Sequence, residues 1–177
     1  MKTPIEVELL QDRGVIWESC PDLEEKSYGK KIEERLELSL VELLYLLEKG
    51  KISVRKGKKI MDFKSLMHHG VKLDKRLHEK YIVYRDLRDR GLVVKTGFKF
   101  GCDFRVYQRG VKVKKGPKST VEHTKWIVFA TSEDYTCSFA ELSRAVRLAH
   151  SIRARMLWAV VDNENDVTYY EVLRMKP

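Results

Sequence analysis

The spacing of apolar residues changes at Gly91, and this change restricts the folds open to the chain. Before this glycine, large apolar residues recur at helical intervals: Leu73, Leu77, Tyr81 and Tyr84. After it come three short segments, rich in strand-forming residues and bounded by glycine, at 92–97, 98–101 and 103–110. We therefore predict a helix that opens a second domain and is followed by antiparallel strands.

The rest of the second half predicts strands around a single helix. Ser138 and Glu141 have the spacing of a capping box, and the helix that follows them extends to about Arg153. Its apolar face comprises Phe139, Leu142, Val146 and Ala149. Further strands are predicted at 125–130, 156–162 and 167–173, with a turn at 163–166 between the last two.

The first half predicts one strong helix. Ser39 and Glu42 form another capping box, a leucine stripe follows, and Gly50 is suited to end the helix. A short strand at 51–54, a lysine-rich turn and a polar helical stretch from about Asp62 come next. We predict an α/β (α+β) chain of two domains: a small N-terminal mixed α/β domain at 1–75, and a C-terminal domain at 76–177 with a mixed β-sheet flanked by helices.

Composition argues against several classes of protein. The chain has 177 residues, 43% of them hydrophobic, and no apolar run approaches the roughly 20 residues that span a bilayer. The first residues lack the apolar stretch of a signal peptide, so we expect a cytoplasmic protein without a membrane partner. Because Cys20, Cys102 and Cys137 lie far apart and form no CxxC, we expect free thiols rather than disulfides or a zinc site. Phosphate-binding loops and HExxH metal motifs are also missing from the sequence.

The charge of the chain favours a polyanionic partner. Lysine and arginine number 35 against 26 acidic residues, which gives a net charge of +9. The basic residues alternate with aromatic ones through much of the second half. Nucleic acid is the natural partner for such a surface. The alternative is a solvated surface that is merely rich in lysine.

A tyrosine and a histidine flank the most basic segment of the chain. Tyr107 lies in a short predicted strand, and His123 stands in the sequence VEHTK. The residues between them include Arg109, Lys112, Lys114, Lys115 and Lys118, which would attract a phosphate backbone. An imidazole is a common proton donor or acceptor at pH 7. Taken alone, however, the pair also fits a tyrosine packed on its sheet and an ordinary loop histidine.

Three segments resemble one known family. EKYIVYRDLRDRGLVVKTGFKFGCDFRVYQRG, followed by a histidine and by AELSRAVRLAHSIRARMLWAVVDNENDVTYYEVLRMKP, is similar to the C-terminal nuclease domain of the archaeal tRNA-splicing endonucleases. LSLVELLYLLEKG resembles the helix of their N-terminal domain. The resemblance implies cleavage of precursor tRNA at both intron edges, within a bulge-helix-bulge fold. It also implies that no metal or other cofactor is used and that the products are a 2′,3′-cyclic phosphate and a 5′-hydroxyl.

The resemblance implies a catalytic triad of tyrosine, histidine and lysine. The first two fall on Tyr107 in DFRVY and on His123 in EHT, but the expected lysine position holds Ala154. Three explanations are open: an inactivating substitution, a natural non-catalytic subunit, or an enzyme that recruits Arg153 or Arg155. We favour a substituted catalytic chain, because a purely structural subunit is expected to lose more of the triad than one member.

The resemblance also implies contacts with RNA and with other subunits. Two arginines that grip a bulged base would be Arg147 and Arg174. Members of this length form homotetramers, in which the last strand pairs between subunits and an acidic loop enters a basic pocket. Glu133 and Asp134 occupy the position of that loop. The alternative function is a non-catalytic RNA-binding or structural subunit of a heterotetramer.

Overall fold

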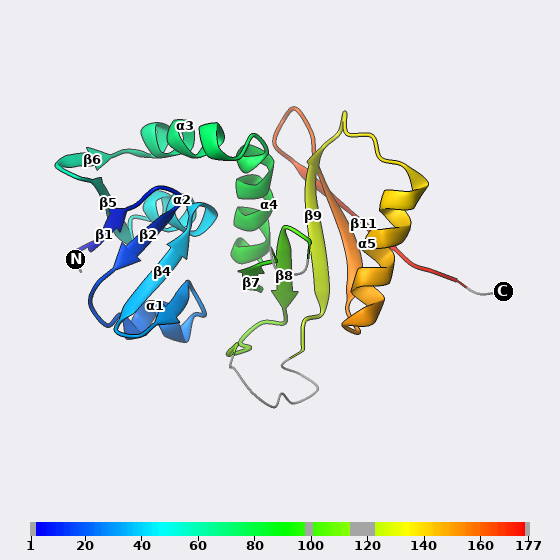
Figure 1. Ribbon diagram of the computed structural model, residues 1–177, viewed down its shortest axis with the longest axis horizontal. Helices are drawn as coiled ribbons and strands as arrows, with labels where there is room; N and C mark the ends of the chain where they lie inside the picture. Colours follow the sequence, from blue (N-terminus) through cyan, green and yellow to red (C-terminus); the bar gives the residue numbers. More distant parts are fainter. Residues whose placement is uncertain (1–2, 98–100, 114–122, 176–177) are drawn as a thin grey trace. The chain divides into compact units, whose positions relative to one another are not determined.

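The computed structural model of this chain describes residues 3–97, 101–113 and 123–175 and is shown in Figure 1. The chain forms two compact units, Met1–Tyr81 and Ile82–Pro177. The division falls inside helix α4 (Leu77–Asp89). The domain boundary expected after residue 75 stays a prediction.

The first unit contains a six-stranded sheet in the order β3-β4-β2-β1-β5-β6. Its strands are β1 (Ile5–Leu9), β2 (Arg13–Ile16), β3 (Lys30–Ile32), β4 (Arg35–Ser39), β5 (Ile52–Lys56) and β6 (Lys59–Met61). The strands β1 and β5 run parallel, whereas the other neighbours are antiparallel. The helices of this unit are α1 (Pro21–Glu25), α2 (Leu40–Glu48), α3 (Phe63–Leu73) and the first turn of α4.

Helix α2 is the predicted leucine-rich helix. Its capping box is present, with the Glu42 carboxylate accepting hydrogen bonds from the backbone and the hydroxyl of Ser39. The side chains of Leu43 and Leu44 are completely buried. Strand β2 approaches this helix so closely at Gly14 that a side chain there would lie 2.7 Å from Val7 and would also collide with Leu43. The helix therefore anchors the core of the first unit.

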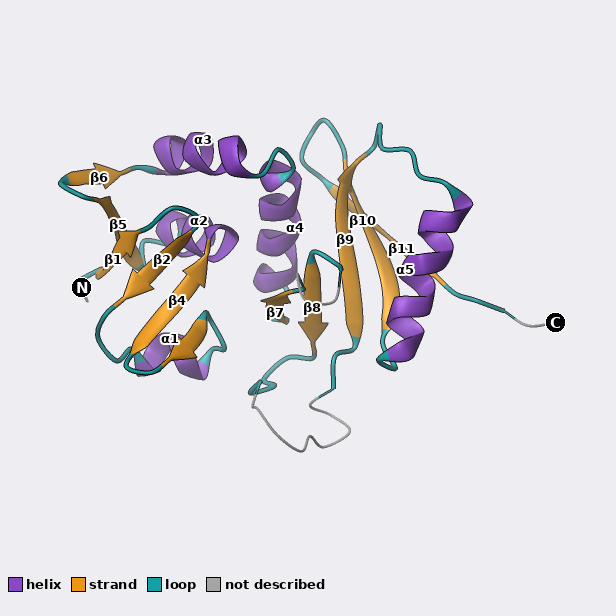
Figure 2. Cartoon of the chain, viewed as in Figure 1, coloured by secondary structure: helices purple, strands orange, loops and turns teal. Residues whose placement is uncertain are grey.

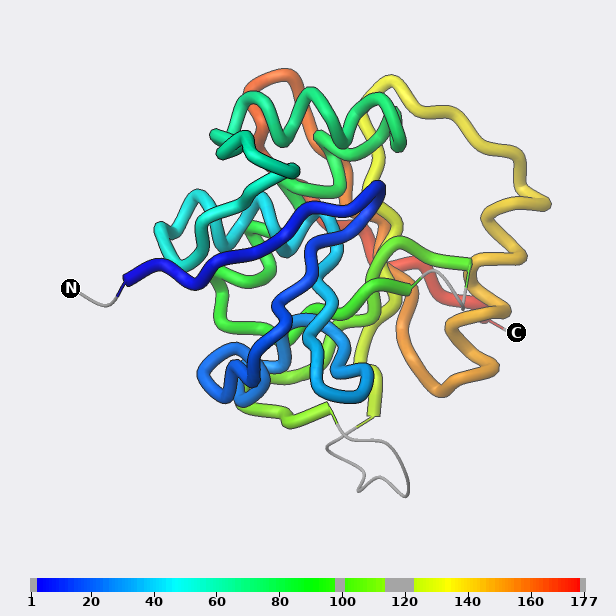
Figure 3. Tube along the Cα trace, turned by 60° about the vertical axis from the view of Figure 1, so that its left-hand side comes forward, coloured from blue at the N-terminus to red at the C-terminus, as the bar shows by residue number. Residues whose placement is uncertain are grey.

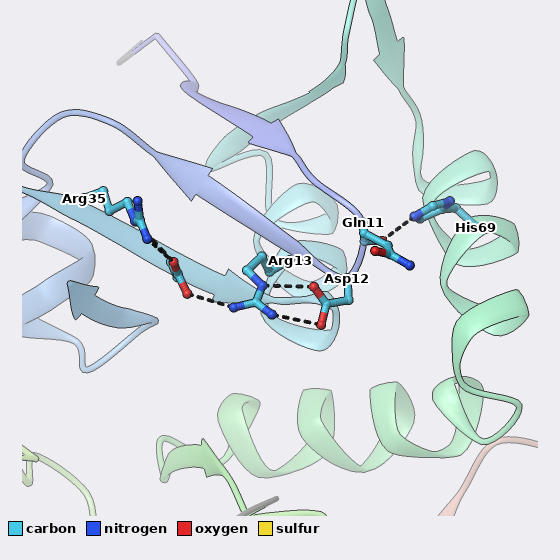
Figure 4. A network of polar contacts seen from close by, with 6 residues as sticks. Gln11, Asp12, Arg13, Arg35 and His69 are labelled. Atoms are coloured by element: carbon cyan, nitrogen blue, oxygen red, sulfur yellow. Dashed lines mark hydrogen bonds and ion pairs between the residues drawn. The ribbon is translucent and has the colours of Figure 1, made fainter.

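Polar contacts fix the turn between β1 and β2 (Figure 4). The Arg13 guanidinium donates to Asp12 at 2.9 Å and also to Glu37, which Arg35 contacts from the other side. The hydrogen bond from Arg13 holds the pKa of the Asp12 carboxyl below its ordinary value. A ring nitrogen of His69 lies 2.9 Å from the Gln11 carbonyl oxygen, so α3 is tied to the same turn.

The helical pattern that begins at Leu73 belongs to two helices, so the prediction of one helix was wrong there. Leu73 is the last residue of α3, and Asp74 adopts an extended conformation with φ −138° and ψ 107°. The Asp74 carboxylate then accepts hydrogen bonds from the backbone of Arg76 at 3.0 Å and from the Lys80 ammonium at 2.6 Å. These contacts stabilise the beginning of α4.

The second unit contains a five-stranded mixed sheet in the order β11-β10-β9-β8-β7 (Figure 2). Its strands are β7 (Val93–Thr96), β8 (Phe104–Tyr107), β9 (Trp126–Ser132), β10 (Arg155–Val161) and β11 (Val167–Val172). Only β9 and β10 pair in parallel among these neighbours. The mixed α/β class predicted from the sequence is thus confirmed. Most of the segment predicted as a strand at 98–101 lies outside the described residues.

Helices cover both faces of this sheet. Tyr84 of α4 packs against Phe104 of β8, with ring centroids 5.8 Å apart. On the other face, α5 (Phe139–Ser151) connects β9 to β10 and packs on Ile127 and Met156. The predicted capping box of α5 is present, because Ser138 and Glu141 exchange hydrogen bonds. None of the helices in the described residues has the length and apolar character needed to cross a membrane.

Candidate active site

Strand register brings the predicted catalytic positions to one end of three neighbouring strands. Val106 of β8 pairs with Trp126 of β9, and Trp126 pairs with Arg155 of β10. The next position outward on β8 is Tyr107, while Ala154 immediately precedes β10. The end of β8 and the beginnings of β9 and β10 therefore form one edge of the sheet.

Tyr107 is completely buried. Its ring packs with Val93 and Val111, and Val113 covers the same cluster. Tyr107 is therefore packed on its sheet in the described structure. A substrate hydroxyl can reach the phenol only if part of this apolar cover moves.

His123 is exposed and lies three residues before β9. The backbone between them is bound to both neighbouring strands, since the Lys125 amide donates to the Val106 carbonyl at 2.9 Å and the Lys125 carbonyl accepts from Arg155 at 2.9 Å. The histidine is thus attached to the same strand ends as Tyr107 and Ala154.

Ala154 occupies the turn between α5 and β10, which Figure 3 shows as the chain passes from α5 into β10. Its amide donates to the Ala149 carbonyl at 2.8 Å, and its methyl group packs against the core beneath α5. Arg153 is exposed with φ +55°, and the Arg155 guanidinium lies 3.3 Å from the Glu171 carboxylate of β11. Neither Arg153 nor Arg155 therefore takes the place of the cation that a lysine at position 154 would supply.

Arg88 connects α4 to the strand that follows it. The side chain is buried, with 8% of the residue exposed. Its Nε donates to the Tyr84 hydroxyl at 3.1 Å and its Nη2 to the Val94 carbonyl at 3.2 Å. This buried arginine aligns α4 with β7, and its role could not be inferred from local spacing.

Asp103 and Gly97 fix the beginning of β8. The Asp103 carboxylate accepts a hydrogen bond from the Ala130 amide at 2.9 Å, so β8 and β9 are joined beyond their ladder. Gly97 has no room for a side chain, because a Cβ there would lie 2.8 Å from the Cys102 carbonyl oxygen. Burial raises the pKa of the Cys102 thiol to about 11. The motif around these residues therefore builds the scaffold that carries Tyr107.

Comparison with known proteins identifies the family. A model of the tRNA intron endonuclease catalytic C-terminal domain matches residues 77–169, and a model of the N-terminal domain matches residues 5–67. The chain belongs to the tRNA-splicing endonuclease family. The resemblance noted from the sequence is thereby confirmed.

Several archaeal members of the tRNA-splicing endonuclease family are similar over most of their length. The protein of Thermococcus gammatolerans is 44% identical over 147 residues, or 83% of this chain and 82% of the relative. That of Thermococcus onnurineus is 41% identical over 97% of both chains. That of Methanococcus maripaludis is 38% identical over 99% of this chain and 97% of the relative. Each of the three is named a tRNA-splicing endonuclease.

The basic residues that this family resemblance implicates in RNA binding are exposed where the structure describes them. Lys112 is exposed in the segment after β8, whereas Lys114 and Lys115 lie outside the described residues. Arg147 is exposed on α5, and Arg174 is exposed beyond β11. Arg109 is held near the end of α4, since its Nε donates to the Arg90 carbonyl at 2.8 Å.

The acidic pair that the family resemblance assigns to assembly lies just beyond β9. Glu133 and Asp134 are both exposed. The Glu133 carboxylate accepts a hydrogen bond from Asn163 at 2.6 Å, so the turn before α5 contacts the turn between β10 and β11. Within residues 3–97, 101–113 and 123–175, no three histidine, cysteine or carboxylate side chains gather as a metal site would require. Cys20, Cys102 and Cys137 are free thiols.

Proposed function

We propose that this chain is a subunit of an endonuclease that cuts precursor tRNA at the intron boundaries, within a bulge-helix-bulge fold. The observation that supports this most strongly is the strand register, because Tyr107 and Ala154 are the positions next to the paired residues Val106 and Arg155 at the same end of the sheet. The net charge of +9 is suited to an RNA substrate.

The proposed reaction is an internal transesterification. The ribose 2′-oxygen attacks the adjacent phosphorus, which requires a base for its proton, an acid for the leaving 5′-oxygen and a cation for the charge on the phosphoryl oxygens. Tyr107, in its phenolate form, serves as the base that accepts this proton. His123 protonates the leaving oxygen. The products are a 2′,3′-cyclic phosphate and a 5′-hydroxyl, and the reaction consumes no external nucleophile.

The alanine at position 154 makes this reaction slow. A lysine there would bind the non-bridging phosphoryl oxygens, and the loss of one such contact lowers a rate by about 10² to 10³. Because the contact strengthens mainly in the transition state, the affinity for uncut RNA is largely retained. The chain therefore binds its substrate tightly and cuts it slowly.

The substitution Ala154→Lys tests this proposal. The purified variant should cut a bulge-helix-bulge RNA about 10² to 10³ times faster than the parent, in the presence of EDTA. The RNA ends should carry the cyclic phosphate, which acid treatment opens. Ala154→Met is the matched control, since it adds a long side chain without charge. An Ala154→Lys protein that leaves the RNA intact would remove the catalytic proposal.

A second candidate function is a non-catalytic subunit of a heterotetramer. Two observations favour it, the alanine at position 154 and the complete burial of Tyr107. Such a subunit would bind RNA but would remain inactive after Ala154→Lys, unless a second type of subunit were added. The same assay therefore separates the two candidates.

We also propose that the chain assembles as a homotetramer in the cytoplasm. The exposed Glu133 and Asp134 support an electrostatic contact between subunits. On the RNA side, Arg147 and Arg174 would stack on an extruded base, and Lys112 would attract the phosphate backbone together with Lys114 and Lys115.

A further inference from the structure

Lys125 lies between the two strands that carry the proposed tyrosine and the alanine. Val106, Trp126 and Arg155 are paired across the three strands. Lys125 precedes Trp126 and therefore lies one position beyond these pairs, toward the end of the sheet. Its backbone amide donates to β8 and its carbonyl accepts from β10, both at 2.9 Å. Tyr107 and Ala154 are the neighbouring positions on those two strands.

The Lys125 ammonium is available to an anion. In the structure its Nζ lies 4.4 Å from the centroid of the Trp126 ring. Among the described residues, no carboxylate forms an ion pair with it. A cation–π contact at a partly exposed site is worth only about 0.5–1 kcal/mol. A phosphate oxygen at the sheet edge would therefore compete with the ring for the ammonium.

Two other described arginines of this unit, Arg155 and Arg109, already have partners. Arg155 pairs with Glu171 on the far side of β10, and Arg109 donates to the carbonyl at the end of α4. Arg153 lies in the exposed turn with a left-handed backbone. Lys125, by contrast, immediately precedes the central strand β9, and neighbouring strands lie only about 4.8 Å apart. Its flexible four-carbon stem can reach either neighbour.

We propose that Lys125 supplies part of the positive charge that position 154 lacks, by binding a non-bridging oxygen of the scissile phosphate, so that the slow cleavage by the parent depends on it. This inference rests on the proposed function. The bond from the 2′-oxygen to phosphorus forms while the bond from phosphorus to the 5′-oxygen breaks. One proton leaves the 2′-hydroxyl for Tyr107, and another passes from His123 to the 5′-oxygen. Lys125 remains protonated throughout and stabilises the charge on the phosphoryl oxygens.

Four proteins test the role of Lys125: the parent chain, Lys125→Met, Ala154→Lys and the double variant with both changes. Lys125→Met keeps an unbranched apolar stem beside Trp126 while removing the charge. Single-turnover cleavage of a bulge-helix-bulge RNA is measured at saturating protein, and affinity is measured separately by filter binding. Lys58→Ala, in the exposed turn between β5 and β6, is the control for the loss of one positive charge.

If Lys125 acts as proposed, Lys125→Met lowers the single-turnover rate about 10²-fold and changes the dissociation constant less than about threefold. The double variant regains the lost rate, because Ala154→Lys returns a cation to the same edge. Lys125→Arg retains most of the parent rate, and Lys58→Ala cuts as the parent does. Melting temperatures within a few degrees of the parent show that each variant is folded.

Other outcomes overturn the inference in distinguishable ways. If the parent cuts and Lys125→Met cuts equally fast, Lys125 has no part in the reaction while the proposed function stands. The same conclusion follows if only the proteins with Ala154→Lys cut RNA. A slow Lys125→Met protein that is not rescued in the double variant shows that the loss is not one of charge. If neither the parent nor Ala154→Lys cuts, the proposed function is wrong and the inference falls with it.

Discussion

The removal of one oxygen atom separates the two roles of Tyr107, packing in the apolar cluster and proton transfer in the proposed reaction. Tyr107→Phe keeps the ring that packs with Val93 and Val111. We expect its free energy of unfolding to fall by only about 1 kcal/mol, whereas the cleavage rate of the Ala154→Lys background should fall about 10² to 10⁴-fold. Thermal melts and single-turnover assays measure the two effects. Equal cleavage rates for the phenylalanine and tyrosine proteins would show that another group is the base.

Arg147 and Arg174 are expected to give the protein a preference for bulged RNA over a plain duplex. Replacement of Arg147 and Arg174 by alanine should weaken binding to a bulge-helix-bulge RNA by about 1–3 kcal/mol per stacked base, because a guanidinium stacks on an extruded base. A plain duplex of equal length should lose much less. Lys112→Ala is the comparison, since a phosphate contact should weaken both RNAs equally and flatten the salt dependence. Equal losses on both RNAs for the arginine variants would instead make them ordinary phosphate contacts.

At the scale of elements, Asp74 controls where α4 begins. Burial opposes ionisation of its carboxyl, but the hydrogen bond and charge of Lys80 outweigh this and hold the pKa below its ordinary value. The resulting stabilisation is present above the unfolded pKa of about 3.9 and is lost as the pH falls through the lower folded pKa. Asp74→Asn should therefore lower the free energy of unfolding at pH 7 by about 1 kcal/mol or less, since the partly exposed pair is screened by solvent.

Chemical denaturation at pH 7 and at about pH 3 measures this effect of Asp74. The difference between Asp74→Asn and the parent should shrink at the lower pH, where the parent carboxyl is itself becoming neutral. Lys80→Met should show the same dependence on pH. A difference that stays constant between the two conditions would show that the ion pair contributes nothing and that only the backbone contacts of the cap matter.

Elements with local signals were predictable from the sequence, and pairings between distant segments were not. The capping boxes at Ser39 and Ser138 locate α2 and α5, and alternation locates the strands of the second unit. The strands β1–β4 and β6 were not predicted. Two of their pairings, β1 with β5 and β2 with β4, join segments that are distant in the sequence. The apolar spacing predicted one helix that continues through Leu73. In the structure, α3 ends at Leu73 because Asp74 adopts an extended conformation.

In the candidate site, too, local sequence signals were readable but contacts between distant segments were not. Tyr107 and His123 stand out chemically, but only the resemblance to a family assigned them roles. Lys125 carried no local signal, because it becomes a neighbour of Tyr107 and Ala154 only through the pairing of β8, β9 and β10. The parallel pairing of β9 with β10 depends in turn on the crossover through α5, which local residue patterns do not specify.

At the scale of the whole molecule, assembly is expected to depend on charge. Glu133→Gln together with Asp134→Asn should convert tetramers into dimers, because the carboxylates no longer attract a basic pocket of another dimer. The glutamine can still accept the hydrogen bond from Asn163, so the turn itself should persist. Light scattering at moderate salt measures the mass.

Two other exposed glutamates provide the control for this double variant. Glu33 and Glu34 lie in the turn between β3 and β4, so changing both to glutamine removes the same number of charges. That control should retain the mass of the parent. If the protein with Glu133→Gln and Asp134→Asn remains tetrameric, the acidic turn is not part of the interface between subunits.

Strand β9 lies between the residues proposed for RNA cleavage and those proposed for subunit assembly. Its first residue follows His123 and Lys125, and its last, Ser132, precedes the acidic turn. A strand of seven residues spans roughly 23 Å, so the two ends are distant from each other. Because the beginnings of β9 and β10 are fixed by their own register, insertions in the turn before α5 need not disturb the residues at the opposite edge. Subunit affinity and cutting rate can therefore diverge independently among descendants of one gene, and a duplicated copy could lose either property while keeping the other.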